Sequence, residues 1–291
     1  MNPALIIGCG DIGRRVAALC RDQGVPVFGL ARSVETAAQV VAEGIQSVTA
    51  DLAAPETLAA LPTGGAEVFY FAPPPNEGET DPCLRNFLAA IDPDALPAKV
   101  VLLSTTAVYG DCRGAWITEE QPVQPQTARG RRRLDGETAL RAWSAHTGAP
   151  HVILRVGGIY GPGRLPLARL KQGLPIVRED ESPYTNRIHQ DDLAQICVAA
   201  ALRGRNGAVY NVSDGRPGAM SNYFKAVAAA CGLPAPPEVG LAEAEKVMSE
   251  GMLSYFQESR RLDNSKLLRE LRISLRYPSL AEGLAGVDCE A

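Results

Sequence analysis

Near the start of the chain, a glycine-rich turn lies between a predicted strand and a predicted helix, and this arrangement strongly limits the possible folds. Residues 4–8 form an apolar run that ends at a glycine and predicts a buried strand, and residues 12–23 have helical spacing. Between the two stands Gly8-Cys9-Gly10-Asp11-Ile12-Gly13, which has the GxGxxG spacing. A turn of this kind between a strand and a helix predicts a dinucleotide site; the alternative is a glycine-rich turn without a ligand.

Each residue of this turn has a physical role in the prediction. Gly8 permits the tight turn, Gly10 lets the pyrophosphate approach the backbone, and Gly13 lets the helix pack closely on the strand. Asp11 and Ile12 belong to the helix N-terminus, whose free N–H groups face the phosphates. We therefore expect these five residues to contact the cofactor.

The end of the second strand, predicted over residues 25–30, distinguishes two cofactors. An NAD site usually has an acidic residue ~20 residues after the glycines, where it holds the ribose 2′-OH. This chain has Ala31-Arg32-Ser33 there instead. A guanidinium can pair with a 2′-phosphate, so we expect Arg32 and Ser33 to bind NADP in preference to NAD. A solvated loop arginine is the alternative.

Strands and helices alternate along the first half of the chain. Further strands are predicted over residues 47–50, 67–72, 99–104 and 152–156, and helices over residues 34–43, 55–61 and 134–147. Such alternation predicts an α/β fold with a doubly wound parallel sheet. The regularity breaks near Gly161, where the elements shorten. Further on, Asp192 is predicted to cap a helix over residues 193–202, and His189 to orient a loop.

Composition excludes several classes of protein. Lys and Arg total 29 against 33 Asp and Glu, a net charge of −4, and aromatic residues make up 5%. A nucleic-acid surface needs a basic excess or stacking aromatics, so no nucleic-acid partner is expected. No apolar run approaches the ~20 residues of a membrane span, and no signal peptide is recognisable, so a cytoplasmic location is expected. The scattered histidines predict no metal site.

The cysteines predict a reduced protein. There are seven, an odd number, with wide spacings and no CxxC pair, and several lie in apolar runs. A reduced cysteine in such a run behaves as a small hydrophobic residue. The pattern therefore favours a reducing compartment over a disulfide scaffold.

Five segments in the right order carry a family resemblance. Leu103-Ser104-Thr105-Thr106-Ala107-Val108-Tyr109-Gly110 is similar to the strand end of the extended short-chain dehydrogenase/reductases, which include the NAD-dependent epimerases and dehydratases. The YeeZ-like branch is the most similar in character. The other matching segments are residues 154–163, with Tyr160-Gly161-Pro162-Gly163, and residues 187–194, 210–213 and 260–268.

The resemblance implies a Rossmann-type doubly wound sheet with a smaller, interleaved C-terminal substrate lobe. The nucleotide domain would span residues 1–160, with 189–213 returning to it, and the substrate lobe residues 161–291. It also implies an NAD(P) cofactor, a small-molecule substrate and a monomer or homodimer. The residues expected to line the cofactor are Asp51 and Leu52 near the adenine and Ala72 and Pro73 near the nicotinamide ribose.

The same resemblance places a catalytic Ser/Thr on Thr105, which would bond a substrate oxygen, with Ser104 beside it and near the cofactor. A simple strand terminus is the alternative. The family's YxxxK tyrosine and lysine fall on Arg129 and Arg133, within Arg129-Gly130-Arg131-Arg132-Arg133. Arginine keeps its proton above pH ~12, so Arg129 cannot be the acid/base. Arg133 can still supply a cation to the cofactor.

This departure leaves three functions open. One is an NADP-preferring oxidoreductase or epimerase-like enzyme with altered acid/base groups, and another is a dinucleotide-binding or sensor protein that has lost catalysis. The third is a protein with a vestigial nucleotide site that acts through a partner surface. The arginine cluster is either a solvated helix start or a site for an anion, since cations are unfavourable at a helix N-terminus. Tyr109, Arg164 and Arg187 are the candidate substrate residues. They are compatible with an anionic substrate, but the sequence does not identify it.

Overall fold

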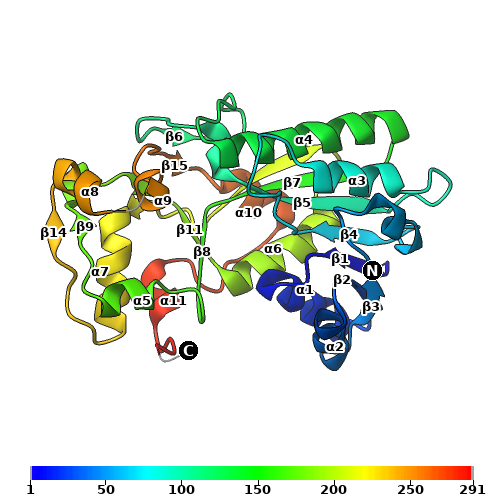
Figure 1. Ribbon diagram of the computed structural model, residues 1–291, viewed down its shortest axis with the longest axis horizontal. Coiled ribbons are helices and arrows are strands. Elements are labelled where there is room, and N and C mark those ends of the chain that lie inside the picture. Colours follow the sequence, from blue (N-terminus) through cyan, green and yellow to red (C-terminus); the bar gives the residue numbers. More distant parts are fainter. Residues whose placement is uncertain (1, 249, 290–291) are drawn as a thin grey trace.

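A computed structural model describes residues 2–248 and 250–289. Within them a parallel sheet of seven strands forms the centre of the molecule (Figure 1). From β1 the chain runs outward in one direction through β2 and β3, and then returns to continue on the other side through β4, β5, β7 and β12. In spatial order the strands are β12 (Ala208–Val212), β7 (His151–Val156), β5 (Lys99–Thr105), β4 (Glu67–Tyr70), β1 (Ala4–Ile7), β2 (Val27–Ala31) and β3 (Gln46–Thr49).

Helices cover both faces of this sheet, which explains why its central strands are apolar throughout rather than alternating. One face packs against α1 (Asp11–Asp22), α2 (Val34–Ala42), α6 (Gln190–Arg203) and α10 (Ser265–Leu271). The other packs against η1 (Pro55–Ala60), α3 (Pro82–Ala90) and α4 (Ala128–Thr147). The fold is therefore the predicted α/β doubly wound fold of Rossmann type.

A smaller lobe lies at the end of the molecule remote from β3 (Figure 1). Its own apolar core includes Leu170, Phe224 and Leu284, from three of its helices. Its helices are α5 (Leu167–Lys171), α7 (Met220–Ala230), α8 (Leu241–Val247), α9 (Glu250–Leu253), α11 (Leu280–Leu284) and the short η3 (Glu179–Glu181). Its strand pairs are β9 (Ile176–Val177) with β14 (Glu238–Val239) and β10 (Tyr184–Thr185) with β13 (Gly218–Ala219).

Two further strand pairs join distant parts of the chain. β8 (Gly158–Tyr160) runs parallel to β11 (Arg187–His189), and β6 (Trp116–Ile117) runs parallel to β15 (Arg261–Leu262). The second pair brings a late segment of the chain beside the loop that follows β5 and its one-turn helix η2 (Thr106–Tyr109). This crossing matters for the site, because it carries residues near 260 to the carboxyl end of β5.

The structure corrects two expectations from the sequence and adds one helix that was not predicted. Helix α4 begins at Ala128, six residues earlier than predicted, because the Thr127 side chain caps it by accepting the N–H of Gly130 at 3.2 Å. Helix α3 was not predicted. Asp192 is not a helix cap: His189 caps α6, while the buried Asp192 carboxylate accepts backbone N–H groups from Arg276 and Tyr277.

The cysteine prediction is wrong for one pair. Cys231 and Cys289 form a disulfide across 58 residues, with a Cα–Cα distance of 5.6 Å, in the core of the smaller lobe. The spacing of the cysteines along the sequence does not indicate a contact between residues so far apart, so the sequence did not predict this disulfide. Outside this disulfide, the other cysteines of the described chain are Cys9, Cys20, Cys83, Cys112 and Cys197.

Candidate functional site

A cavity of about 600 Å³ opens at the carboxyl ends of β1, β2, β3 and β4. It lies where the strand order reverses between β1 and β4, the place where open α/β sheets bind ligands. The structure brings together here seven of the residues predicted to contact the cofactor: Gly8, Gly10, Arg32, Asp51, Leu52, Ala72 and Pro73.

The glycines of the first turn fit a pyrophosphate. A Cβ on Gly8, whose φ is +104°, would stand 2.8 Å from the Ala72 nitrogen, and one on Gly13 would stand 2.4 Å from the Gly8 oxygen. Both positions therefore require glycine for close packing. At Gly10, by contrast, a Cβ would meet no atom within 4 Å. The space kept open above Gly10 is where a phosphate group can approach the backbone and the N-terminus of α1.

Other predicted cofactor residues support this turn from outside the cavity. Ile12 and Gly13 are buried in α1. Asp11 is ion-paired twice, to Arg15 at 3.0 Å and to Arg164 at 2.8 Å. Ser33 caps α2, accepting the N–H of Thr36 at 3.2 Å. Because Arg164 is held by Asp11, it does not line the substrate-side cavity described next.

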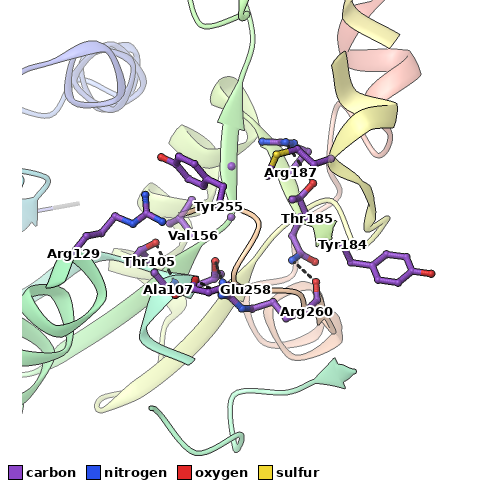
Figure 2. Close-up of a pocket in the computed structure, with 15 residues that line it drawn as sticks. Thr105, Ala107, Arg129, Val156, Tyr184, Thr185, Arg187, Tyr255, Glu258 and Arg260 are labelled. Carbon is purple, nitrogen blue, oxygen red and sulfur yellow. Dashed lines mark hydrogen bonds and ion pairs between the residues drawn. The ribbon is translucent and has the colours of Figure 1, made fainter. Parts of the chain in front are cut away.

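A second cavity, of about 250 Å³, lies between the sheet and the smaller lobe (Figure 2). Thr105, at the end of β5, lines it and also lines a third space of about 260 Å³. That third space shares Pro73, Pro74 and Asn76 with the cofactor cavity. Thr105 thus lies at the junction of the second cavity and the third space, next to the cavity at the glycine-rich turn.

Arg129 and Arg133, which the resemblance predicts at the family's Tyr and Lys positions, face this junction. Arg129 lines both the second and the third spaces, and its guanidinium lies 4.3 Å from the centre of the Tyr255 ring. Arg133 lies beneath the strand ends and donates to the carbonyl oxygens of Ala72 at 3.4 Å and Leu103 at 3.2 Å. Burial lowers the pKa of Arg133 from its usual value.

The rest of the cluster excludes the solvated-helix interpretation. Arg132 is buried and donates to the Gly78 carbonyl at 2.8 Å, and Arg131 pairs with Glu79 at 2.8 Å. Gly130, which precedes them, is required to be glycine, because a Cβ there would stand 2.7 Å from the Ala107 oxygen. The cluster thus fastens α4 against η2 and the loop after β4, and leaves Arg129 on the cavity.

Two of the predicted site residues, Ser104 and Tyr109, bond to other side chains inside the protein instead of lining a cavity. Ser104 is buried and donates to Glu137 Oε1 at 2.6 Å, and Glu137 in turn accepts from Arg155 Nη2 at 2.7 Å. Tyr109 is also buried; its hydroxyl donates to Asn211 at 2.7 Å, and burial raises its pKa to about 12. Neither Ser104 nor Tyr109 lines the cavities described above.

Arg187 does line the second cavity. Its guanidinium lies 4.0 Å from the centre of the Tyr223 ring, and its Nη2 donates weakly to Thr185 Oγ1 at 3.4 Å. Burial lowers its pKa. Among the described residues, neither Arg187 nor Arg129 has a carboxylate within ion-pair distance. Two arginines without acidic partners make the cavity suited to an anion.

Sequence reasoning missed the residues that the smaller lobe and the β15 strand bring to this cavity. Arg260 donates to the Gly110 carbonyl at 3.0 Å and to Thr106 Oγ1 at 3.3 Å, and it is ion-paired with Glu258. The resemblance over residues 260–268 was a signal for this segment, but nothing in it pointed to Glu258. The other lining residues that were missed are Thr106, Tyr184, Thr185, Asn186, Met220 and Tyr255.

The part of the chain that the structure describes contains neither a cluster suited to a metal ion nor a helix suited to cross a membrane. Over residues 2–248 and 250–289, no cluster of three or more His, Cys, Asp or Glu side chains is placed to hold a metal ion. Over the same residues, no helix has the length and apolar character needed to cross a membrane.

The fold and the glycine-rich turn together define the class of protein, a dinucleotide-binding protein with a Rossmann-type fold. A model of the NAD dependent epimerase/dehydratase family matches residues 4–213. The chain therefore belongs to that family, whose members bind NAD(P).

Solved structures share this architecture along nearly the whole chain. A functionally unknown conserved protein from Silicibacter pomeroyi has 29% identity and a TM-score of 0.82, covering 98% of both chains. A dTDP-glucose 4,6-dehydratase from Streptomyces venezuelae, whose structure has NAD bound, has 21% identity and a TM-score of 0.78, covering 99% of this chain and 95% of that one.

Curated relatives match over shorter segments. A dTDP-L-rhamnose 4-epimerase from Burkholderia thailandensis is 29% identical over 127 residues, which are 39% of this chain and 35% of the relative. The matches to the first curated relatives thus span about a third of their length (34% and 35%).

Proposed function

We propose that the protein is an NADP-preferring oxidoreductase or epimerase-like enzyme that acts on a small anionic substrate. One observation carries the proposal: Thr105 lines both the substrate-side cavity and the space that continues into the cofactor cavity. A hydroxyl at such a junction can hold a substrate oxygen while the substrate carbon faces the cofactor. Arg129 and Arg187, which have no acidic partner among the described residues, supply the positive charge for an anionic group.

The residues of the cofactor cavity fit an NAD(P) molecule. The turn at Gly10 would take the pyrophosphate, Asp51 and Leu52 the adenine, and Ala72 and Pro73 the nicotinamide ribose. Arg133 donates to the carbonyl oxygens of Ala72 and Leu103, which fix its position. It would supply the positive charge that the family's lysine provides. When bound, the nicotinamide supplies hydride transfer to or from a substrate carbon.

Arg32 supports NADP over NAD, because it lines the cofactor cavity at the end of β2 together with Thr36. Replacing Arg32 with alanine is expected to weaken NADPH binding by about 10-fold or more, since a hydrogen bond to a charged group contributes about 1.5–3 kcal/mol. NADH binding should stay unchanged, because NADH has no 2′-phosphate. Fluorescence titration of both cofactors checks this, with the exposed Arg205→Ala as control. Equal losses for NADPH and NADH would contradict the assignment.

The second candidate, a dinucleotide-binding sensor without catalysis, is favoured by the arginine at the family's tyrosine position. A screen separates the two: purified protein with NADPH and a panel of aldehydes, ketones and keto acids, and with NADP⁺ and hydroxy acids, sugar phosphates and nucleotide sugars. We expect turnover with an anionic member, and Thr105→Ala should lower kcat/KM about 100-fold. Thr138→Ala, on the exposed side of α4, is the matched control. Cofactor binding without any turnover would favour the sensor.

A further inference from the structure

Glu258 is the acidic group of the substrate-side cavity. It lies between α9 and β15, in a segment that the β15–β6 pairing carries to the carboxyl end of β5. In Figure 2 it lies between Ala107 and Arg260, on the same side of the cavity as Thr105. Among the described residues that line the cavity, it is the one carboxylate.

The two oxygens of this carboxylate have different surroundings. The side chain is deeply buried, with Glu258 only 8% exposed. Oε2 accepts from Arg260, whereas Oε1 is buried and has no hydrogen-bond partner among the described residues. A buried polar atom without a partner costs free energy, and a bound ligand or a catalytic role is one explanation for such an atom.

Arg260 explains how the unpartnered oxygen is held in place. Its guanidinium is anchored by the Gly110 carbonyl and by Thr106 Oγ1, both next to the Thr105 strand end. This anchoring fixes the carboxylate through Oε2 and leaves Oε1, buried in the wall of the cavity that Glu258 lines, as the oxygen that a ligand can satisfy. A ligand hydroxyl would satisfy Oε1 with a charge-assisted hydrogen bond.

Arg129 cannot be the general acid/base of the site, because an arginine cannot exchange a proton near neutrality. Resting on the function proposed above, we propose that Glu258 takes over this role: its Oε1 accepts the proton of the substrate's hydroxyl, and the substrate is therefore an anionic alcohol or the corresponding carbonyl compound. Thr105 then holds the same oxygen from the β5 side.

The proton and electrons of this step balance. The substrate O–H bond breaks and its proton bonds to Glu258 Oε1, while the O–H electron pair forms the carbonyl π bond as the carbon loses its hydride to NADP⁺. The substrate is oxidised by two electrons, the cofactor is reduced by two, and Glu258 later releases its proton to solvent. In the reductive direction the protonated Glu258 returns the proton to the carbonyl oxygen.

Glu258→Gln is the discriminating variant. The amide oxygen can still accept from Arg260, so a purely structural role survives, whereas the proton acceptor is lost. With the substrate found in the screen, we expect kcat/KM to fall about 100-fold or more, as for loss of a general base. NADPH binding should stay unchanged. Glu43→Gln, in an exposed ion pair with Arg14, is the matched control.

Calorimetry on the cofactor-free protein gives a readout independent of turnover. The wild type should bind the hydroxyl-bearing substrate about 10-fold more tightly than its deoxy analogue, and Glu258→Gln, which replaces the charge-assisted hydrogen bond by a neutral one, should weaken that preference. A variant that keeps the full preference, or keeps its turnover, overturns the proposal while the proposed function stands. A wild type that binds and converts no member of the panel overturns both.

Discussion

Replacing Gly10 with valine is expected to abolish cofactor binding while leaving the fold intact. The Cβ of a residue at this position meets no atom within 4 Å, and the Gly10 backbone, with φ −74° and ψ −165°, is accessible to any residue. The new side chain would fill the space that the pyrophosphate needs. Wild-type protein with NADPH at 100 Kd should gain ~2.7 kcal/mol of stability, and the variant should gain none in a thermal-shift assay.

Gly218→Val is the matched control for this experiment. Gly218 also has open space where its Cβ would stand, but it lies in β13 of the smaller lobe. That variant should retain the full ligand-induced shift. If Gly10→Val responded to NADPH as the wild type does, the pyrophosphate would not lie over the first turn and the assignment of the cavity would fail.

Among the substitutions proposed in these experiments, Glu137→Ala is expected to lower the free energy of unfolding the most. Its carboxylate, 1% exposed, accepts from Ser104 Oγ at 2.6 Å and from Arg155 Nε and Nη2 at 3.1 and 2.7 Å. Without it the buried Arg155 keeps its charge but loses its ion-pair partner, at a cost of about 3–5 kcal/mol. Urea unfolding should therefore show a much lower midpoint.

The exposed pair of Glu43 with Arg14 provides the comparison. Glu43→Ala should change the unfolding free energy by about 0.5 kcal/mol or less, because solvent screens such pairs. If the two alanine variants had similar stability, the buried network beneath β5 and β7 would not support the strand end that carries Thr105.

Local sequence patterns predicted the cofactor half of the site. The strand, glycine turn and helix are contiguous, and the second, third and fourth strands each end at residues that the parallel sheet gathers at one edge. Arg32 was assigned to the cofactor site from its position after the second strand, and Asp51 and Pro73 from the family resemblance; all three line one cavity. Periodicity also identified most strands of the central sheet, because a strand buried on both faces is largely apolar.

The substrate half could not be predicted in this way, because it depends on contacts between distant segments. Glu258 reaches the end of β5 only through the pairing of β15 with β6, and Arg164 pairs with Asp11 across 153 residues. Helical spacing also could not show that Arg132 and Arg133 are fastened to carbonyl groups rather than solvated. Such residues are placed by tertiary packing, which has no local signature in the sequence.

A crystal structure of the protein with NADP⁺ tests the central claim most directly. We predict the pyrophosphate over Gly10, the 2′-phosphate within hydrogen-bonding distance of Arg32, and the nicotinamide beside Thr105, facing the cavity that Glu258 lines. Electron density for the cofactor elsewhere, or a nicotinamide turned away from Thr105, would contradict the proposal that these cavities form one catalytic site.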